Sequence, residues 1–323
     1  MKILRLHNSI SLTGGLGNQL FQLAAGLYLS KNELLMIEWR LGSPRLNKFD
    51  LPEITSFMLP TTVIIGKRSR KSFLASKAHG YVLRQGINLR IYEKYGFIRK
   101  LSKLFASLVI SVYNKRLTIL KVSSGVGYSK ITSSDRGRLL IGYFQTHLWM
   151  EDIEVLNAMR KIELKEKSST VKYFMELAEV EKPLIVHIRL GDYKNENSFG
   201  IPSVEYYTSA IQRLFNSDKY GKIWIFSDEP DLAFELLGSA IPNEVRWIHN
   251  EGESAAQTLE IMRHGKGYVI ANSTFSWWAA FLSYTADPEV IAPDPWFKLL
   301  DSPKDLIPPN WHVIPGWIGR EKL

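Results

Sequence analysis

The sequence predicts an α/β protein built on doubly wound parallel sheet, and three observations support this class. Apolar strands alternate with helices from about residue 168 to 293. A strand, a Gly-rich turn, a helix and a second strand follow one another over residues 9–39. At 323 residues the chain is long for one hydrophobic core. We therefore expect two domains, residues 1–160 and 161–323.

The first elements form a βαβ unit. Strand SISLT leads into the turn GGLGN and then a helix over residues 19–30, and LLMIEW (34–39) forms the next strand. Apolar residues recur at helical spacing through the turn and helix, which predicts one inward face. They are Leu16, Leu20, Leu23, Ala24 and Leu27.

The Gly-rich turn resembles a dinucleotide fingerprint only loosely. A GxGxxG pattern needs a third glycine where this chain has Leu20, which argues against NAD binding. Gly15 and Gly17 would instead allow a substrate to approach the backbone closely, while Asn18 and Gln19 would supply amide hydrogen bonds. A tight turn with no ligand role is the alternative.

After residue 150 the elements are more sharply defined. We expect helices at about 168–181, 206–215, 230–238, 255–264 and 277–284. We expect strands at about 184–188, 222–228, 245–248, 267–271 and 289–293. In contrast, residues 66–135 are basic and poorly periodic, so only helices and loops are predicted there.

Composition limits the protein's class. The absence of cysteine excludes disulfides and thiol catalysis, and fits a cytoplasmic setting. No apolar run reaches the roughly 18 residues needed to cross a bilayer, and the first fifteen residues lack a signal-peptide core. We therefore expect a cytoplasmic protein, either free or at the inner face of the membrane.

Positive charge is concentrated in residues 61–150. This segment holds 17 Lys and Arg against Glu93 and Asp135, whereas the rest of the chain holds 24 against 30 acidic residues. Within it, residues 97–121 combine basic ends with an apolar middle, as an interfacial helix does. Contact with an anionic membrane and a solvated basic face on packed helices both remain open. Nucleic-acid binding is disfavoured, because the interleaved aromatic and basic pattern of known modules is missing.

Three polar clusters each follow an apolar strand in the second half, and parallel strands would bring them to one edge of the sheet. The first, HIRLGDY, contains His187, Arg189 and Asp192. The Arg189 guanidinium suits a phosphate or a carboxylate, although an ion pair tying a loop to the sheet is equally open. The second, IFSDE, contains Ser227 and Asp228, which would bind a ribose or base, or cap the next helix.

The third cluster is a phosphate-site candidate at a helix start. Asn272, Ser273, Thr274 and Ser276 precede or open an apolar helix, and they exceed the single residue that a cap requires. No HExxH or DxD spacing occurs, so we expect no metal. A leaving phosphate would then depend on Arg189 and backbone amides, a kind of stabilisation typically worth about 3 to 4 kcal/mol.

Together, GGLGNQLFQLAAGLYLS, HIRLGDY, IFSDE and NSTFSWWAAF resemble, in order and spacing, the α-1,2-fucosyltransferases of glycosyltransferase family 11. The resemblance runs from about residue 12 to 298 and is weakest over 60–130. It implies a GT-B fold of two facing Rossmann-like domains with parallel sheets. It also implies inverting, metal-independent transfer of L-fucose from GDP-fucose to the 2-hydroxyl of a galactoside on an oligosaccharide or lipid-linked glycan, with no cofactor.

The resemblance also assigns roles to matching positions. Arg189 would grip the pyrophosphate, with His187 and Asp192 shaping the same site, and Asp228 would hold the guanine or ribose. The residues expected to cradle phosphate or pack near the nucleotide are Ser273, Thr274, Phe275 and Ser276. The motif expected to face the cleft from residues 1–160 comprises Gly15, Gly17, Asn18 and Gln19. One departure is Leu190, where many relatives have a second arginine.

The implied mechanism is attack of the acceptor hydroxyl on the anomeric carbon opposite GDP, through an oxocarbenium-like state. Asp192 is the candidate general base because it is a carboxylate near the expected cleft. Two alternatives stay open. One is a fucosyltransferase of different linkage or acceptor, and the other is a non-catalytic protein that binds nucleotide sugar or glycan.

Overall fold

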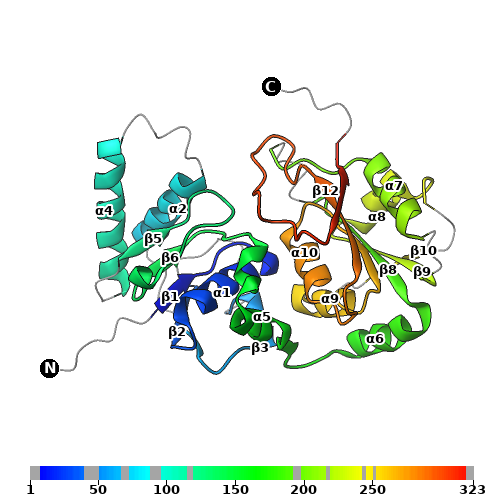
Figure 1. Ribbon diagram of the computed structural model, residues 1–323, viewed down its shortest axis with the longest axis horizontal. Helices are drawn as coiled ribbons and strands as arrows, with labels where there is room; N and C mark the ends of the chain where they lie inside the picture. Colours follow the sequence, from blue (N-terminus) through cyan, green and yellow to red (C-terminus); the bar gives the residue numbers. More distant parts are fainter. Residues whose placement is uncertain are drawn as a thin grey trace. The chain divides into compact units, whose positions relative to one another are not determined.

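The computed structural model describes residues 8–39, 51–66, 73–87, 96–114, 119–191, 198–215, 219–241, 245–249 and 252–317. The chain forms two compact units (Figure 1). Unit 1 comprises the described residues up to Glu163 together with Pro303–Leu306, and unit 2 comprises the remainder from Leu164. Among the described residues, no helix has the length and apolar character to cross a bilayer.

Unit 1 contains a five-stranded sheet in its described part, in the order β4-β2-β1-β6-β5, with every pair parallel. The strands are β1 (Asn8–Ser11), β2 (Leu35–Glu38), β4 (Val63–Ile65), β5 (Leu120–Val122) and β6 (Leu139–Ile141), with β3 (Phe57–Met58) outside the sheet. The helices are α1 (Leu16–Ser30), α2 (Phe73–Ile87), α4 (Gly96–Asn114) and α5 (Ile153–Arg160). Short 3-10 turns lie at η2 (Glu53–Ser56), η4 (Ser133–Asp135) and η5 (His147–Glu151).

Residues 66–135, for which only helices and loops are predicted, do hold α2 and α4, but strand β5 also lies within them, and this part of the prediction is wrong. Two more strands of the unit 1 sheet, β4 and β6, lie in the remainder of the basic segment 61–150. Each of these strands has three residues, which is too short to produce a recognisable alternation among the basic loops.

Residues Pro303–Leu306 return to unit 1 late in the chain. The Asp305 carbonyl accepts hydrogen bonds from the Thr146 hydroxyl at 2.8 Å and from the His147 amide at 2.9 Å. Leu306 is fully buried, and Pro303 lies so close to Gly127 that a Cβ there would sit 2.7 Å away. The loop after β6 is therefore held in place by hydrogen bonds to a segment more than 150 residues further along the chain.

Unit 2 follows the chain through β7 (Glu163–Leu164) and has a six-stranded, all-parallel sheet in its described part. Its order is β10-β9-β8-β11-β12-β13. The strands are β8 (Pro183–Ile188), β9 (Lys222–Ser227), β10 (Val245–Trp247), β11 (Gly267–Val269), β12 (Glu289–Asp294) and β13 (His312–Pro315). The helices are α6 (Ser169–Glu181), α7 (Val204–Phe215), α8 (Pro230–Leu237), α9 (Ala255–Met262) and α10 (Thr274–Phe281).

The strand order of unit 2 is that of a doubly wound Rossmann sheet. Numbered along the chain, its strands read 3-2-1-4-5-6, and the order reverses between β8 and β11. Two α/β units with parallel sheets are what the GT-B prediction requires, and this part of the prediction is confirmed. That the two domains face each other stays a prediction.

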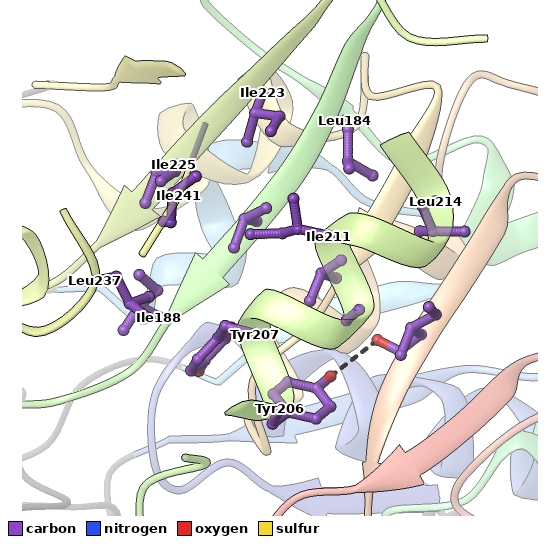
Figure 2. Close-up of a cluster of buried hydrophobic side chains, with 14 of the residues drawn as sticks. Leu184, Ile188, Tyr206, Tyr207, Ile211, Leu214, Ile223, Ile225, Leu237 and Ile241 are labelled. Atoms are coloured by element: carbon purple, nitrogen blue, oxygen red, sulfur yellow. Dashed lines mark hydrogen bonds between the residues drawn. The ribbon is translucent and has the colours of Figure 1, made fainter. Parts of the chain in front are cut away.

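Helices cover both faces of the unit 2 sheet (Figure 1). Leu184, Val186 and Ile188 pack in one cluster with α7 and α8, as Figure 2 shows for Leu184 and Ile188. On β9 the intervening Trp224 contacts Phe174 of α6, with ring centroids 5.6 Å apart. Because both faces are covered, the central strands read in the sequence as nearly continuous apolar runs.

Tyr206, in the first turn of α7, ties that helix to the sheet (Figure 2). Its buried hydroxyl donates to the Ile270 carbonyl at 2.7 Å and lies 3.1 Å from the Ile291 carbonyl.

We expect Tyr206→Phe to lower the free energy of unfolding by about 1–2 kcal/mol, because buried carbonyls lose a donor. Urea denaturation followed by tryptophan fluorescence measures this change. Tyr173→Phe, at a side chain 56 % exposed, is the control, and equal effects of the two substitutions would contradict the prediction.

Candidate functional site

The three polar clusters of the second half meet at one edge of the unit 2 sheet, as expected. β9, β8 and β11 are consecutive neighbours and parallel, with Ile188 opposite Ser227 and Val186 opposite Val269. Residues that follow these strands therefore leave the sheet at its carboxyl edge. This edge includes the point between β8 and β11 where the strand order reverses, which is where open α/β sheets bind ligands.

Arg189 and Asp228 form the central pair of this edge. Arg189 Nη1 lies 3.0 Å from Asp228 Oδ2, and the two side chains are 30 % and 23 % exposed. The Leu190 amide donates to Asp228 Oδ1 at 2.9 Å. The ion pair that the sequence analysis gave as an alternative is therefore present. It holds the partly exposed Arg189 guanidinium at the carboxyl end of β8. A role for Asp228 in holding guanine or ribose stays a prediction.

Gly191 is required by this arrangement. A Cβ on Gly191 would lie 2.4 Å from Asp228 Oδ2, well inside van der Waals contact. Leu190 is buried in the core cluster beneath α7. The position at which the resemblance leads us to expect a second arginine is thus part of the apolar interior in this chain. The candidate base Asp192 lies outside the described residues.

His187 is buried on the opposite face of β8, beside the start of α10. Its ring centroid lies 5.8 Å from that of Phe275. The pKa of His187 is lowered to about 4, chiefly by burial; the negative charge of Asp228 opposes this shift, and the positive charge of Arg189 adds to it. Its Nδ1 has no hydrogen-bond partner among the described residues. The imidazole is therefore neutral near pH 7 and carries a buried polar atom that a ligand could satisfy.

The third cluster forms the start of α10, which begins at Thr274, three residues earlier than predicted. Ser273 is the N-cap and accepts from the Phe275 amide at 3.3 Å, while the Ser276 hydroxyl donates to the Ser273 carbonyl at 3.2 Å. Amides in the first turn of a helix have no partner within the helix. The first turn therefore presents positively polarised amides beside β8, and Thr274 and Phe275 are half-buried there.

Two residues of these clusters have structural contacts. The Asn272 side-chain amide donates to the carbonyls of Phe199 and Gly200 at 3.0 and 3.1 Å and holds that loop on the sheet. Ser227 Oγ accepts from the Glu229 amide at 3.1 Å. Ser227 therefore stabilises the turn before α8, and Asp228 contacts Arg189 and Leu190 instead of capping the helix. Binding of the GDP-fucose donor by Asn272 and Ser227 stays a prediction.

Unit 1 has its own polar cluster where its strand order reverses, between β1 and β6. Gly14 has φ +78°, and α1 starts after Gly15, an exposed N-cap without a side-chain hydrogen bond. Gly17 is buried in the first turn of α1. Asn18 is half-buried, and its Oδ1 accepts from Gln145 Nε2 at 2.9 Å.

Gln19 is part of the internal framework of unit 1. Its Nε2 donates to the Gly14 carbonyl at 3.1 Å, and its Oε1 accepts from the Ile54 amide at 3.1 Å. Both ends of this buried amide therefore fix the turn. Binding of a substrate by Gln19 stays a prediction, as do the roles of Gly15, Gly17 and Asn18.

Sequence reasoning missed two side chains at these edges. Gln145 follows Phe144, whose φ of +55° is unusual for a bulky residue, and the Phe144 carbonyl accepts from Trp149 Nε1 at 2.8 Å. A signal was present in the sequence: LLI (139–141) is an apolar run, and the polar residues Gln145 and Thr146 follow it after Gly142 and two aromatic residues. Tyr207 is the second. Burial raises the pKa of its hydroxyl, and the charge of nearby Asp228 raises it further.

Comparison with known proteins identifies the chain's family. The model of glycosyl transferase family 11 matches residues 128–314, more than half of the chain. The chain belongs to glycosyl transferase family 11. The polar clusters described above therefore belong to a family 11 glycosyltransferase with two parallel-sheet units. In the described part of the chain, no group of three or more His, Asp or Glu side chains is arranged to hold a metal ion.

This family 11 chain is similar to two curated proteins of Escherichia coli. It is 26% identical over 311 residues to an alpha-1,2-colitosyltransferase, covering 89% of this chain and 91% of that protein. It is 34% identical over 116 residues to the O-antigen biosynthesis glycosyltransferase WbnK, covering 35% and 38% of the two chains. A structure of NodZ alpha-1,6-fucosyltransferase soaked with GDP-fucose matches at 15% identity and a TM-score of 0.47, covering 90% of this chain and 96% of that one.

We expect the burial of His187 to make stability depend on pH. Its folded pKa of about 4 lies below the ordinary histidine value of 6.5, so the unfolded state binds more protons between these values and stability falls as the pH drops through this window. The loss between about pH 7 and pH 5 should be about 2 kcal/mol.

The measurement is urea denaturation of the wild type and of His187→Gln at both pH values. The difference in pH dependence between the two proteins isolates His187, because all other titrating groups are common to both. An identical loss of stability in wild type and variant would show that His187 is not held neutral by burial.

Proposed function

We propose that this family 11 glycosyltransferase transfers L-fucose from GDP-β-L-fucose to the 2-hydroxyl of a terminal galactoside. The transfer inverts the anomeric centre and forms an α-1,2 linkage in a glycan or surface polysaccharide. One geometric observation carries the proposal. Arg189, held by Asp228 at the end of β8, and the first turn of α10, after β11, flank the point where the strand order of the unit 2 sheet reverses.

These two groups suit a leaving diphosphate. As the bond between fucose and GDP breaks, negative charge develops on the β-phosphate, and preorganised donors stabilise it without reorganising. The ion pair with Asp228 positions the Arg189 fork, and the amides around Thr274 add the dipole of a helix N-terminus. The buried Nδ1 of neutral His187 would gain a hydrogen-bond partner from the bound donor.

In this mechanism the acceptor hydroxyl attacks the anomeric carbon on the side opposite GDP, through an oxocarbenium-like state. Asp192 is the proposed general base. Metal independence is part of the proposal and rests on the absence of a DxD pair from the sequence. The similarity to an alpha-1,2-colitosyltransferase supports the proposed α-1,2 linkage and makes colitose a second candidate donor sugar.

The acceptor side of the proposal is a galactoside-terminated oligosaccharide or lipid-linked glycan, handled in the cytoplasm or at the inner face of the membrane. The cysteine-free sequence supports this setting. The similarity to an O-antigen biosynthesis glycosyltransferase supports a polysaccharide precursor as the acceptor.

Turnover with defined substrates tests the function. The purified protein is incubated with GDP-fucose or GDP-colitose and a lactose-type acceptor, with and without EDTA, while GDP release and the product linkage are measured. We expect EDTA-resistant, acceptor-dependent release of GDP from GDP-fucose and an α-1,2-linked product. Turnover confined to GDP-colitose would replace fucose as the donor sugar. GDP binding without turnover would identify a non-catalytic binding protein, and a different linkage would refute the proposed acceptor hydroxyl.

Arg189→Ala tests the phosphate role. We expect a rate loss of about 10²–10³-fold and weaker GDP binding, because one preorganised donor of the leaving group is lost. Isothermal titration with GDP and turnover assays measure both effects, and the melting temperature reports folding. Arg213→Ala, at an exposed arginine on α7, is the matched control in the same unit. Near-normal turnover by Arg189→Ala would show that the diphosphate binds elsewhere.

A further inference from the structure

The outer face of α4 carries a continuous stripe of exposed apolar side chains. α4 lies beside α2 in unit 1 (Figure 1). The stripe consists of Leu101, Leu104, Phe105, Leu108 and Val112, which are 51 %, 60 %, 69 %, 53 % and 78 % exposed. Their spacing of three or four residues places them on one side of the helix over three turns. Scattered apolar residues are ordinary on a surface, but a contiguous patch of this kind marks an interaction site.

The opposite face of α4 attaches the helix to unit 1. Ala106 and Ile110 are buried in a cluster with Ala75 and Val82 of α2 and with Leu139 of β6. Because this inner face already supplies the packing that holds the helix, the outer stripe contributes little to the fold of the unit. Leu and Phe at these outer positions therefore need an explanation outside the core of unit 1.

The charge around the stripe identifies the kind of partner. From residue 94 to residue 134 the sequence contains eight Lys and Arg and no Asp or Glu. Arg99, Lys100 and Lys103 belong to the first two turns of α4, and Lys115 and Arg116 follow its last residue in the sequence. An apolar stripe with basic residues at both ends of its helix is the composition of a helix that lies in the plane of an anionic bilayer.

A second copy of the chain fits this surface less well. A two-fold dimer would bring α4 of both chains together, and with it two stretches of sequence that each hold eight Lys and Arg and no Asp or Glu, which repel each other. Anionic lipid headgroups would instead neutralise the basic residues, while the acyl region receives the Leu and Phe side chains.

We propose that the α4 stripe, Leu101, Leu104, Phe105, Leu108 and Val112, docks unit 1 on an anionic membrane surface. The helix lies parallel to the surface, with the stripe inserted below the headgroups, and the positive charge of the sequence from residue 94 to residue 134 favours anionic lipid. This inference is independent of the donor and acceptor proposed above, because it uses no residue of the sheet edges.

Vesicle flotation tests the proposal. The full-length protein is mixed with vesicles of phosphatidylcholine alone or with about 30 % phosphatidylglycerol. We expect binding to the anionic vesicles, weakened by about 0.5 M NaCl, and little binding to phosphatidylcholine. Phe105→Ser/Val112→Ser should reduce binding about tenfold or more, since two inserted side chains become polar. The matched control is Val180→Ser/Phe234→Ser, at side chains 80 % and 57 % exposed in unit 2, which should bind like the wild type.

Three outcomes would overturn the proposal. They are no binding of the wild type to anionic vesicles, equal binding by the stripe variant and the wild type, or a wild-type dimer that the stripe variant converts to monomer. The melting temperature of each variant confirms that it is folded. Turnover of a water-soluble acceptor, measured on the same samples, separates a loss of docking from any failure of the proposed reaction.

Discussion

Parallel pairing of β8 with β9 on one side and with β11 on the other is the constraint on which the rest of unit 2 depends. Residues that are 39 positions apart, Arg189 and Asp228, become neighbours because both follow strands whose carboxyl ends share one edge. The same pairing brings the start of α10 against His187. In such a sheet the chemistry is set by whatever follows the strands, and the apolar strand interiors serve to hold those residues in register.

Asp228 illustrates how a charged group near an apolar interior can be retained. Its two oxygens are engaged by the Arg189 guanidinium and the Leu190 amide, and Gly191 leaves the space that this approach needs. Removing one partner of such a pair leaves the other uncompensated, which generally costs more than the pair itself contributes. The arrangement also restricts the Arg189 fork before any ligand arrives, and this preorganisation is what a phosphate site requires.

The sequence was most informative where strands are buried on both faces. LIVHI and IWIF are apolar runs, and they correspond to β8 and β9 almost residue for residue. β13, with three of its four residues more than a third exposed, and the three-residue strands β4 and β5 of the basic segment lacked that signal. Strand order is a through-space property, so no local pattern could show that β8 and β11 are neighbours.

The same limit applied to individual residues of the candidate site. The polar residues after each strand were recognisable, but their partners were not, because contacts such as Asn18 with Gln145 join positions 127 residues apart. Leu190 is buried because it lies on the side of the sheet that α7 covers. The sequence alone does not show which side that helix covers. The start of α10 was misjudged because Ser273, one of several small polar residues, is the one that caps it.

The return of Pro303–Leu306 to unit 1 has a consequence for engineering. The N-terminal half of this chain is not complete by itself, since a fragment ending at Glu163 would lack the Asp305 carbonyl that holds Thr146 and His147. Chimeras that exchange one half between family members must therefore carry a matching late segment with the N-terminal half. A fusion made only after Glu163 would combine the loop after β6 of one parent with the segment equivalent to Pro303–Leu306 of the other.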